Sequence, residues 1–158
     1  MPAETNRRRN LLWALGIFCL ILVSFRVYAA KEMDSLPAPF TIEIDGTPIA
    51  KAPADAADRT QAHIGTEPAA VFELKDKRLQ SDGHILARAL SEDRSFSPKK
   101  VMWFKADTTV PVYDVVAAQD GEDYSLQFSG AGLMASDGQV FADIMGTNPS
   151  RVVVKMQS

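Results

Sequence analysis

The sequence predicts an all-β domain preceded by one hydrophobic N-terminal helix. Three observations support this prediction. Short runs of β-branched and aromatic residues recur along residues 40–158, and turn residues separate them at intervals of about ten residues. One Asp-Gly pattern is repeated three times, and the only long apolar run lies at residues 11–25. The 158 residues suffice for one domain with an ordinary hydrophobic core.

Residues 1–30 have the composition of a segment that directs export. Three arginines at residues 7–9 precede the apolar run, and a Val-x-Ala sequence ends at Ala29. Two interpretations stay open: a signal peptide cleaved near Ala29, or an uncleaved transmembrane anchor in which Arg26 reaches the far interface. In both, the basic tail stays in the cytoplasm and the C-terminal part is exported. We therefore expect a single-pass membrane protein with an extracytoplasmic domain, or a secreted protein.

Composition excludes several classes of function. Cys19 is the only cysteine, so the exported part is expected to have neither disulfides nor a cysteine-based metal site. From residue 31 onward there are 13 Lys/Arg and 19 Asp/Glu, a net charge of −6, which argues against nucleic-acid binding. Nucleotide-binding and calcium-binding motifs are absent from the sequence, and no cofactor or metal is expected.

Along the chain, residues 31–39 are polar and contain prolines, which predicts a linker, and the folded domain is expected at residues 40–158. The first predicted strand is Phe40–Ile44, in which apolar residues alternate. Further strands are predicted at residues 71–74, 101–104, 112–113, 115–116, 124–128 and 152–154. Residues 51–67 are polar and rich in alanine, which predicts a long loop that could contain a short helix at residues 54–60.

The repeated pattern is Asp-Gly-x-x-apolar-Ala, found at residues 45–50, 82–87 and 137–142. Each copy is followed by Pro-x-x-Val, which begins at Pro68, Pro98 and Pro149. Asp-Gly supplies positive φ angles at a tight turn, and the alanine is expected where backbones pack closely. Proline can occupy the entry of a strand without a ladder hydrogen bond. A unit repeated in this way indicates a scaffold and not a site of chemistry.

This three-fold layout resembles the β-trefoil, in which three repeats of paired hairpins form a six-stranded barrel with a hairpin cap. The resemblance covers residues 40–155 and is similar in style to small secreted trefoil lectins and protease inhibitors. It implies a barrel of three repeated β-hairpin units and a binding function. Residues 106–123 lie outside the repeat, so an open β-sandwich of hairpins is the alternative.

No pattern of catalytic residues is apparent, and we expect a protein that is not an enzyme. The two histidines are unrelated by spacing, and the common hydrolase motifs are absent. Residues 51–67 and 91–100 are the candidate contact loops, because loops on a rigid β scaffold commonly carry binding residues. The candidate binding residues are Arg59, His63, Asp93, Arg94, Phe96, Lys99 and Lys100. Trp103 is expected in the core, with an exposed carbohydrate platform as the alternative.

Two functions agree with these observations. The first is a non-catalytic extracytoplasmic module that recognises a protein or a glycan through its variable loops. The alternative is a single-pass accessory or assembly subunit of a larger membrane complex, in which the helix at residues 11–25 packs against other helices.

Overall fold

The computed structural model describes residues 30–148 and 150–158. All regular secondary structure in this part of the chain is β-strand, which confirms the predicted all-β class. The fourteen strands are β1 (Glu32–Met33), β2 (Phe40–Ile44), β3 (Thr47–Pro48), β4 (Thr60–Gln61), β5 (Glu73–Lys75), β6 (Arg78–Ser81), β7 (His84–Ala87), β8 (Lys99–Lys100), β9 (Met102–Lys105), β10 (Val115–Asp120), β11 (Asp123–Phe128), β12 (Gly132–Ser136), β13 (Gln139–Asp143) and β14 (Val152–Met156).

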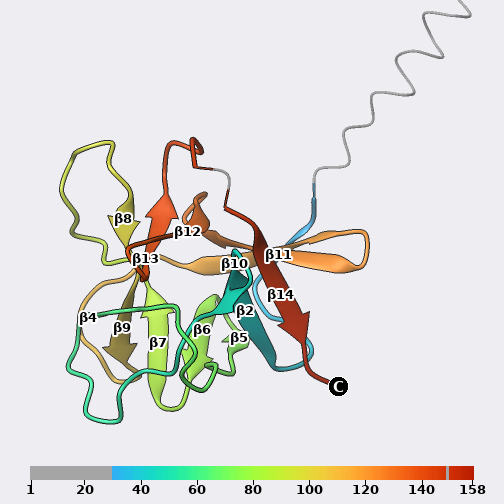
Figure 1. Ribbon diagram of the computed structural model, residues 1–158, viewed down its shortest axis with the longest axis horizontal. Coiled ribbons are helices and arrows are strands. Elements are labelled where there is room, and N and C mark those ends of the chain that lie inside the picture. Colours follow the sequence, from blue (N-terminus) through green and yellow to red (C-terminus); the bar gives the residue numbers. More distant parts are fainter. Residues whose placement is uncertain (1–29, 149) are drawn as a thin grey trace, which may run out of the picture.

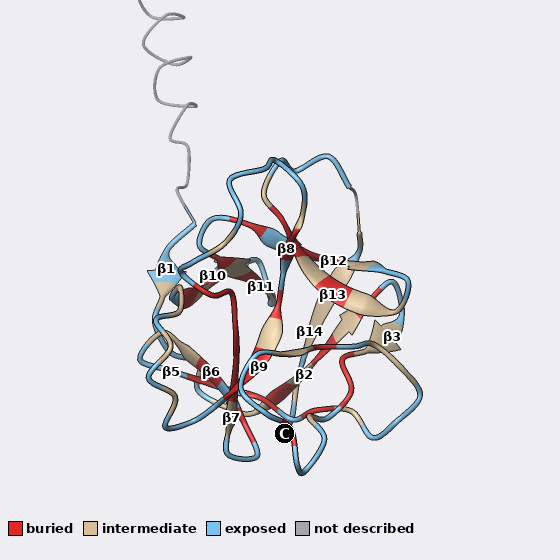
Figure 2. Ribbon diagram, turned by 90° about the vertical axis from the view of Figure 1, so that its left-hand side faces the viewer, coloured by how far each residue is buried: buried red, intermediate tan, exposed pale blue. Residues whose placement is uncertain are grey.

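The strands form four antiparallel sheets around a shared core (Figure 1). One sheet has five strands, in the order β4-β9-β7-β6-β5, and three sheets have three strands each, β1-β10-β11, β12-β13-β8 and β14-β2-β3. Isolated bridges such as Phe40 to Phe72 and Ile49 to Ile64 connect segments outside these ladders. One cluster of buried apolar side chains receives residues from all four sheets, and Figure 2 marks in red the parts of the strands that are buried.

The three Asp-Gly pairs form the same tight turn. Their φ angles are 51° and 84° at Asp45-Gly46, 45° and 74° at Asp82-Gly83, and 51° and 75° at Asp137-Gly138. Positive φ at both central residues is typical of a two-residue type I′ hairpin turn. The turns join β2 to β3, β6 to β7 and β12 to β13, and the alanine that ends each pattern is buried. The prediction that these patterns are hairpin joints is therefore confirmed.

The Pro-x-x-Val element is not equivalent in its three copies, contrary to the prediction. Val101 is fully buried, whereas Val71 is 39% exposed. Successive side chains of an extended segment point to opposite faces. In the first copy Ala70 and Phe72 point into the core, so Val71 between them points to the surface. The proline of the third copy, Pro149, lies outside the described residues.

Residues 31–39 are attached to the domain, although a linker was expected there. β1 pairs with β10, the Leu36 amide donates to the Leu74 carbonyl at 3.0 Å, and the Asp76 amide donates to Ser35 Oγ at 3.0 Å. Met33 and Leu36 pack against the core, so these two apolar side chains account for the attachment of an otherwise polar segment.

Residues 51–67 contain turns and the short strand β4 in place of the short helix that composition suggested. β4 pairs with β9, and Ala62 is fully buried. The Asp58 carboxylate accepts the Lys105 amide at 2.6 Å and the Thr108 hydroxyl at 3.1 Å. The hydrogen bond from the Lys105 amide is the main cause that lowers the pKa of Asp58 below its ordinary value. Sheet pairing and these bonds override the helical preference of the alanines.

Trp103 lies in the core, as predicted, with 1% of its surface exposed. Its ring stacks on Phe72 with centroids 5.7 Å apart, and Phe72 stacks on Phe40 with centroids 6.1 Å apart. The three rings link β9, the segment before β5 and β2. A carbohydrate platform requires an exposed ring, so this burial excludes Trp103 as a sugar-stacking residue.

Within the described residues, no helix is long and apolar enough to cross a membrane. The apolar run at residues 11–25 and the predicted cleavage position near Ala29 lie outside those residues.

Candidate functional site

Two loops lie at the same end of the paired strands β8 and β13 (Figures 1 and 2). The first loop, residues 91–98, leads into β8, and the second loop, residues 144–148, follows β13. β8 and β13 are antiparallel, with Lys99 opposite Ala142. The start of β8 and the end of β13 therefore lie together, which places the two loops side by side.

The buried ammonium group of Lys99 binds the first loop from the interior side, and the Lys99 side chain is only 5% exposed. Lys99 Nζ donates to the Asp93 carbonyl at 2.9 Å, to Asp93 Oδ1 at 2.8 Å and to the Ser95 carbonyl at 2.7 Å, with Ser95 Oγ at 3.2 Å. A buried ammonium is costly unless its donors are satisfied and its charge is paired. The loop supplies both, so the conformation of residues 93–95 and the burial of Lys99 depend on each other.

A second buried cation, Arg88, holds the beginning of the first loop. Arg88 Nε donates to Glu92 Oε1 at 3.0 Å, Nη2 donates to Glu92 Oε2 at 3.3 Å, and Nη1 donates to the Phe128 carbonyl at 2.8 Å. The guanidinium also lies 4.8 Å from the centre of the Tyr113 ring. This bidentate pairing fixes Glu92 in position and orientation. Residues 92–95 are thus restrained at both ends.

Arg94 projects from this restrained segment into solvent, and so does Phe96, the residue that follows the segment. Phe96 is 78% exposed, more than any other large hydrophobic side chain in the described residues, and Arg94 is also exposed. In the described part of the chain, no hydrogen bond or ion pair engages the Arg94 side chain. An exposed aromatic ring and an exposed guanidinium on an ordered loop are suited to protein contacts, because little conformational entropy is lost on binding.

The Asp93 carboxyl has a pKa well below its usual range. The main cause is the hydrogen bond from Lys99, followed by bonds from the Ser95 hydroxyl and the Ser95 amide. Because the pKa is lower in the folded state than the usual unfolded value of about 3.9, ionised Asp93 stabilises the fold above that pH. The stabilisation is lost as the pH falls from about 4 through the folded-state pKa.

This shift predicts a pH dependence that can be measured by urea denaturation of the wild-type protein and the Asp93→Asn variant. The difference between their free energies of unfolding should be constant from about pH 7 to about pH 5 and should shrink at lower pH. A difference that stays constant down to about pH 2.5 would show that the Asp93 charge does not hold the loop.

A pocket of about 260 Å³ lies beside the first loop. Four of the predicted binding residues line it, namely Arg59, Asp93, Lys99 and Lys100, and the predicted Arg94 and Phe96 lie in the adjoining loop. The structure therefore brings six of the seven predicted residues to one end of the molecule. His63 is elsewhere: it is exposed and pairs with Gln139, at the opposite end of β13 from the two loops.

Three of the residues that restrain the loops, Arg88, Glu92 and Asp143, were not predicted. Arg88 and Glu92 are four residues apart in a stretch without helical pattern, and their pairing depends on the turn between them. Asp143 follows a predicted repeat, and its carboxylate holds the second loop. A sequence signal did exist for Asp143, because Asp followed three residues later by Gly146 is typical of a type I turn.

The described residues show no cluster of metal-binding side chains. No group of three or more His, Cys, Asp or Glu side chains in that part of the chain is arranged to hold a metal ion. His84 lies in β7, with Nδ1 3.1 Å from the Asp82 backbone carbonyl, and its ring is T-shaped to that of Trp103 with centroids 6.2 Å apart. His63 belongs to a different part of the fold, so the two histidines do not form a pair.

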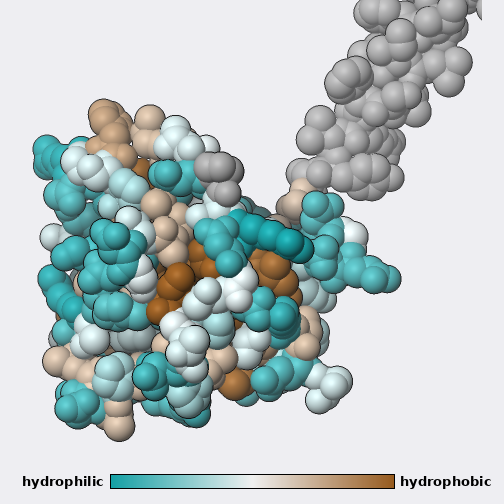
Figure 3. Space-filling model, in the orientation of Figure 1, coloured by the Kyte–Doolittle hydropathy of each residue, from teal (hydrophilic) through white to brown (hydrophobic). Residues whose placement is uncertain are grey.

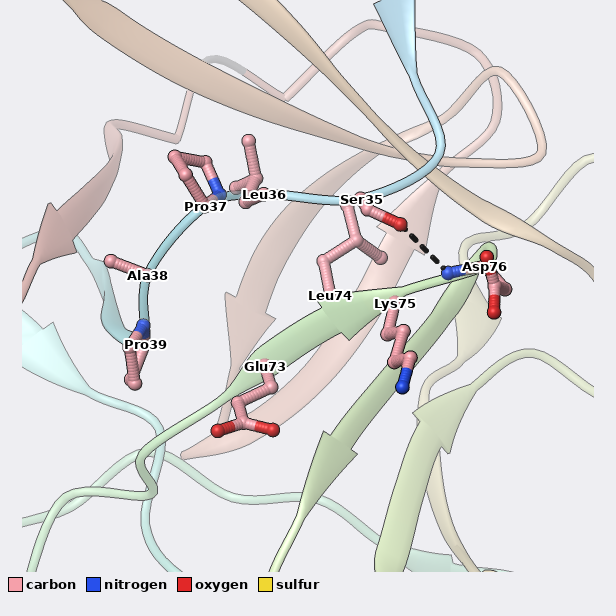
Figure 4. Close-up of a pocket in the computed structure, with 9 residues that line it drawn as sticks. All are labelled: Ser35, Leu36, Pro37, Ala38, Pro39, Glu73, Leu74, Lys75 and Asp76. Atoms are coloured by element: carbon pink, nitrogen blue, oxygen red, sulfur yellow. Dashed lines mark hydrogen bonds between the residues drawn. The ribbon is translucent and has the colours of Figure 1, made fainter.

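A larger pocket of about 340 Å³ lies between residues 35–39 and β5 (Figure 4). Leu74 points from β5 toward Ser35 and Leu36, and the Asp76 amide donates to Ser35 Oγ. Lys75 points the opposite way from its strand, so the charged groups do not converge on the pocket. This pocket is the joint between the N-terminal segment and the domain, and we assign it no binding role.

Comparison with known proteins gives one match. Residues 68–157 match the model of the family described as peptidase inhibitor I66. No curated protein and no solved structure matches the chain. The matched region runs from the segment before β5 to β14 and contains both loops, with Arg88, Lys99 and Asp143 that restrain them. The match covers more than half of the chain, and the protein therefore belongs to the peptidase inhibitor I66 family.

Proposed function

We propose that this protein inhibits a peptidase by placing the first loop in the substrate cleft of the enzyme. Family membership supports a non-catalytic module whose partner is a protein, and specifically a peptidase. The observation that carries the proposal is the contact of Lys99 with two backbone carbonyls of the loop, those of Asp93 and Ser95. No comparable support exists for a glycan ligand, since Trp103 is buried.

The restraint by Lys99 explains how a loop can occupy a substrate cleft without being released as product. A peptidase binds a short stretch of chain in one defined conformation, and a flexible chain loses conformational entropy when it is fixed there. In this loop the carbonyls on both sides of Arg94 are already fixed by Lys99, and Glu92 is fixed by Arg88. The loop therefore binds at low entropic cost and resists the distortion that peptide hydrolysis requires.

The two projecting side chains suit different specificity pockets. Arg94 suits a pocket that contains a carboxylate, and Phe96 suits an apolar pocket. Both are free to enter an enzyme, because neither side chain contributes to the buried network below the loop. The loop thus offers one basic and one aromatic anchor, two residues apart.

The proposal is tested by inhibition assays with trypsin, chymotrypsin, subtilisin, papain, pepsin and thermolysin on small peptide substrates. We expect the wild-type protein to inhibit at least one of them. Replacement of the anchor that fills the specificity pocket, by Arg94→Ala or Phe96→Ala, should then raise the inhibition constant about thirty-fold or more. Val71→Ala is the control, because it shortens an exposed apolar side chain away from the loops.

Two results would contradict the proposed function. One is a wild-type protein that inhibits none of the six enzymes. The other is inhibition that persists unchanged when Arg94 and Phe96 are both replaced by alanine. Either result would assign the two exposed anchors to something other than a peptidase cleft.

We also propose that the domain acts outside the cytoplasm and that its three hairpin units form a β-trefoil. The basic residues before the apolar run at 11–25 support export. The three Asp-Gly hairpin turns, which share one backbone conformation, support the three-fold architecture. Intact mass of the purified protein decides between removal of residues 1–29 and their retention as an anchor.

A further inference from the structure

We propose that the second loop, residues 144–148, forms a separate contact with the same peptidase, on the enzyme surface outside the substrate cleft. Met145 is the anchor of this contact. The inference rests on the proposed function of the first loop and extends it, because it assigns a further interaction surface and the chemistry of the enzyme surface that this loop meets.

A buried side chain restrains the second loop, as Lys99 restrains the first, but here the side chain is acidic. Asp143, at the end of β13, is 8% exposed, and its carboxylate accepts the Gly146 amide at 3.1 Å and the Asn148 amide at 2.8 Å. Gly146 has a φ angle of 65°, which closes the turn after Met145. Met145 is left 55% exposed at the outside of this ordered turn.

The two loops form one surface because their bases are paired. Lys99 carries the first loop and lies opposite Ala142, the neighbour of Asp143, which carries the second loop. Each restraint is a buried polar side chain that binds backbone groups of its own loop, with carbonyls bound by Lys99 and amides bound by Asp143. The relative position of Phe96 and Met145 is therefore set by the β8–β13 ladder.

The size of a stable interface requires more than the first loop. Stable protein complexes bury about 800 Å² on each partner and involve about 20 to 30 residues of each. The first loop supplies eight residues, 91–98, and only part of their surface can enter a cleft. The second loop is the adjacent ordered segment with an exposed apolar side chain, and Figure 3 shows hydrophobic surface at the outer end of these loops beside hydrophilic surface.

The charges at this end define the partner surface further. The acidic groups are used internally: Glu92 binds Arg88, Asp93 binds Lys99, and Asp143 binds backbone amides. The exposed basic residues of this end are Arg94 and Lys100, together with Arg59, whose charge acts on the neighbouring Asp58. The end is thus basic, although residues 31–158 carry a net charge of −6. We infer that the enzyme surface facing Met145 is apolar and is bordered by acidic residues.

The test compares Met145→Asp with Val71→Asp, since each places a carboxylate on an exposed apolar position. The enzyme is one that the wild-type protein inhibits in the panel above. We expect Met145→Asp to raise the inhibition constant about ten-fold or more, mainly through faster dissociation, and Val71→Asp to have no effect. Circular dichroism and thermal unfolding show whether both variants keep the wild-type fold.

Failure of this inference is distinguishable from failure of the proposed function. If Arg94→Ala or Phe96→Ala abolishes inhibition while Met145→Asp inhibits as the wild type does, the second contact is wrong and the function of the first loop stands. If the wild-type protein inhibits no enzyme, the function itself is wrong and the second contact is wrong with it. Inhibition weakened equally by Met145→Asp and Val71→Asp would indicate a general effect of added negative charge, and would also overturn the inference.

A second variant, Asp143→Ala, tests whether the order of the loop matters while Met145 is retained. Loss of the carboxylate releases the Gly146 and Asn148 amides. We expect faster hydrogen exchange at these amides in the free protein and weaker inhibition of the same enzyme. Inhibition equal to that of the wild type, with exchange clearly increased, would show that the second loop does not touch the enzyme.

Discussion

The Lys99→Met variant should lose most of its inhibitory activity while it keeps its fold. Methionine fills the space of the lysine stem but removes the ammonium that holds the Asp93 and Ser95 carbonyls. Those carbonyls lie in an exposed loop and can bind water, so the loss of stability should be moderate. The freed loop must then pay its ordering entropy on binding, and we expect an inhibition constant raised about ten- to a hundred-fold.

The same variant should also become a substrate. With the loop free to adapt, the enzyme can distort and cleave it near Arg94 or Phe96, whichever side chain enters the specificity pocket. The described part of the chain contains no cysteine, so the two fragments separate on a denaturing gel and their masses identify the cleaved bond. Lys105→Met is the control, since Lys105 is exposed on β9. A Lys99→Met protein that inhibits as well as the wild type and stays intact would refute the role of the restraint.

The Trp103→Ala variant should lose about 3–5 kcal/mol of unfolding free energy, the largest stability effect that we predict. Trp103 is 1% exposed and stacks on Phe72, so the substitution removes a buried ring and leaves a cavity between β9 and the segment before β5. Small domains are stable by only about 5–15 kcal/mol, so the variant should be marginally folded at room temperature. Chemical denaturation followed by circular dichroism measures the loss.

The comparison variants are Trp103→Phe and Val71→Ala. Trp103→Phe keeps an aromatic ring against Phe72 and should cost less than Trp103→Ala, and Val71→Ala changes an exposed side chain and should cost little. A Trp103→Ala protein as stable as the wild type would mean that the three stacked rings do not form the centre of the core.

Local patterns predicted the strands and turns well, because their causes are local. Asp-Gly at the hairpin turns requires only that two adjacent residues adopt positive φ, and the alternation of Phe40–Ile44 follows from one buried face. Attachment of residues 31–39 was missed, because it depends on two isolated apolar residues, Met33 and Leu36, that meet strands far along the chain. Sequence spacing alone carries no information on such a contact.

The sequence predicted where the contact loop lies, but not how its conformation is held. The exposed charges and the aromatic residue of the first loop marked it as a contact loop, and the structure brings most of those residues together. Lys99 was expected as a contact residue, whereas it is buried and holds the loop from within. Its role follows from the β8–β13 pairing and from the path of the loop, neither of which a run of eight residues specifies.

We propose that a peptidase binds the two loops at one end of the paired strands β8 and β13. Hydrogen exchange of the protein, alone and in complex with an enzyme that it inhibits, tests this claim most directly. We predict slower exchange on binding at the amides of residues 91–98 and 144–148, with little change at residues 62–67 or at the Asp82-Gly83 turn. Protection confined to residues 62–67 or to that turn, with the two loops unchanged, would contradict it.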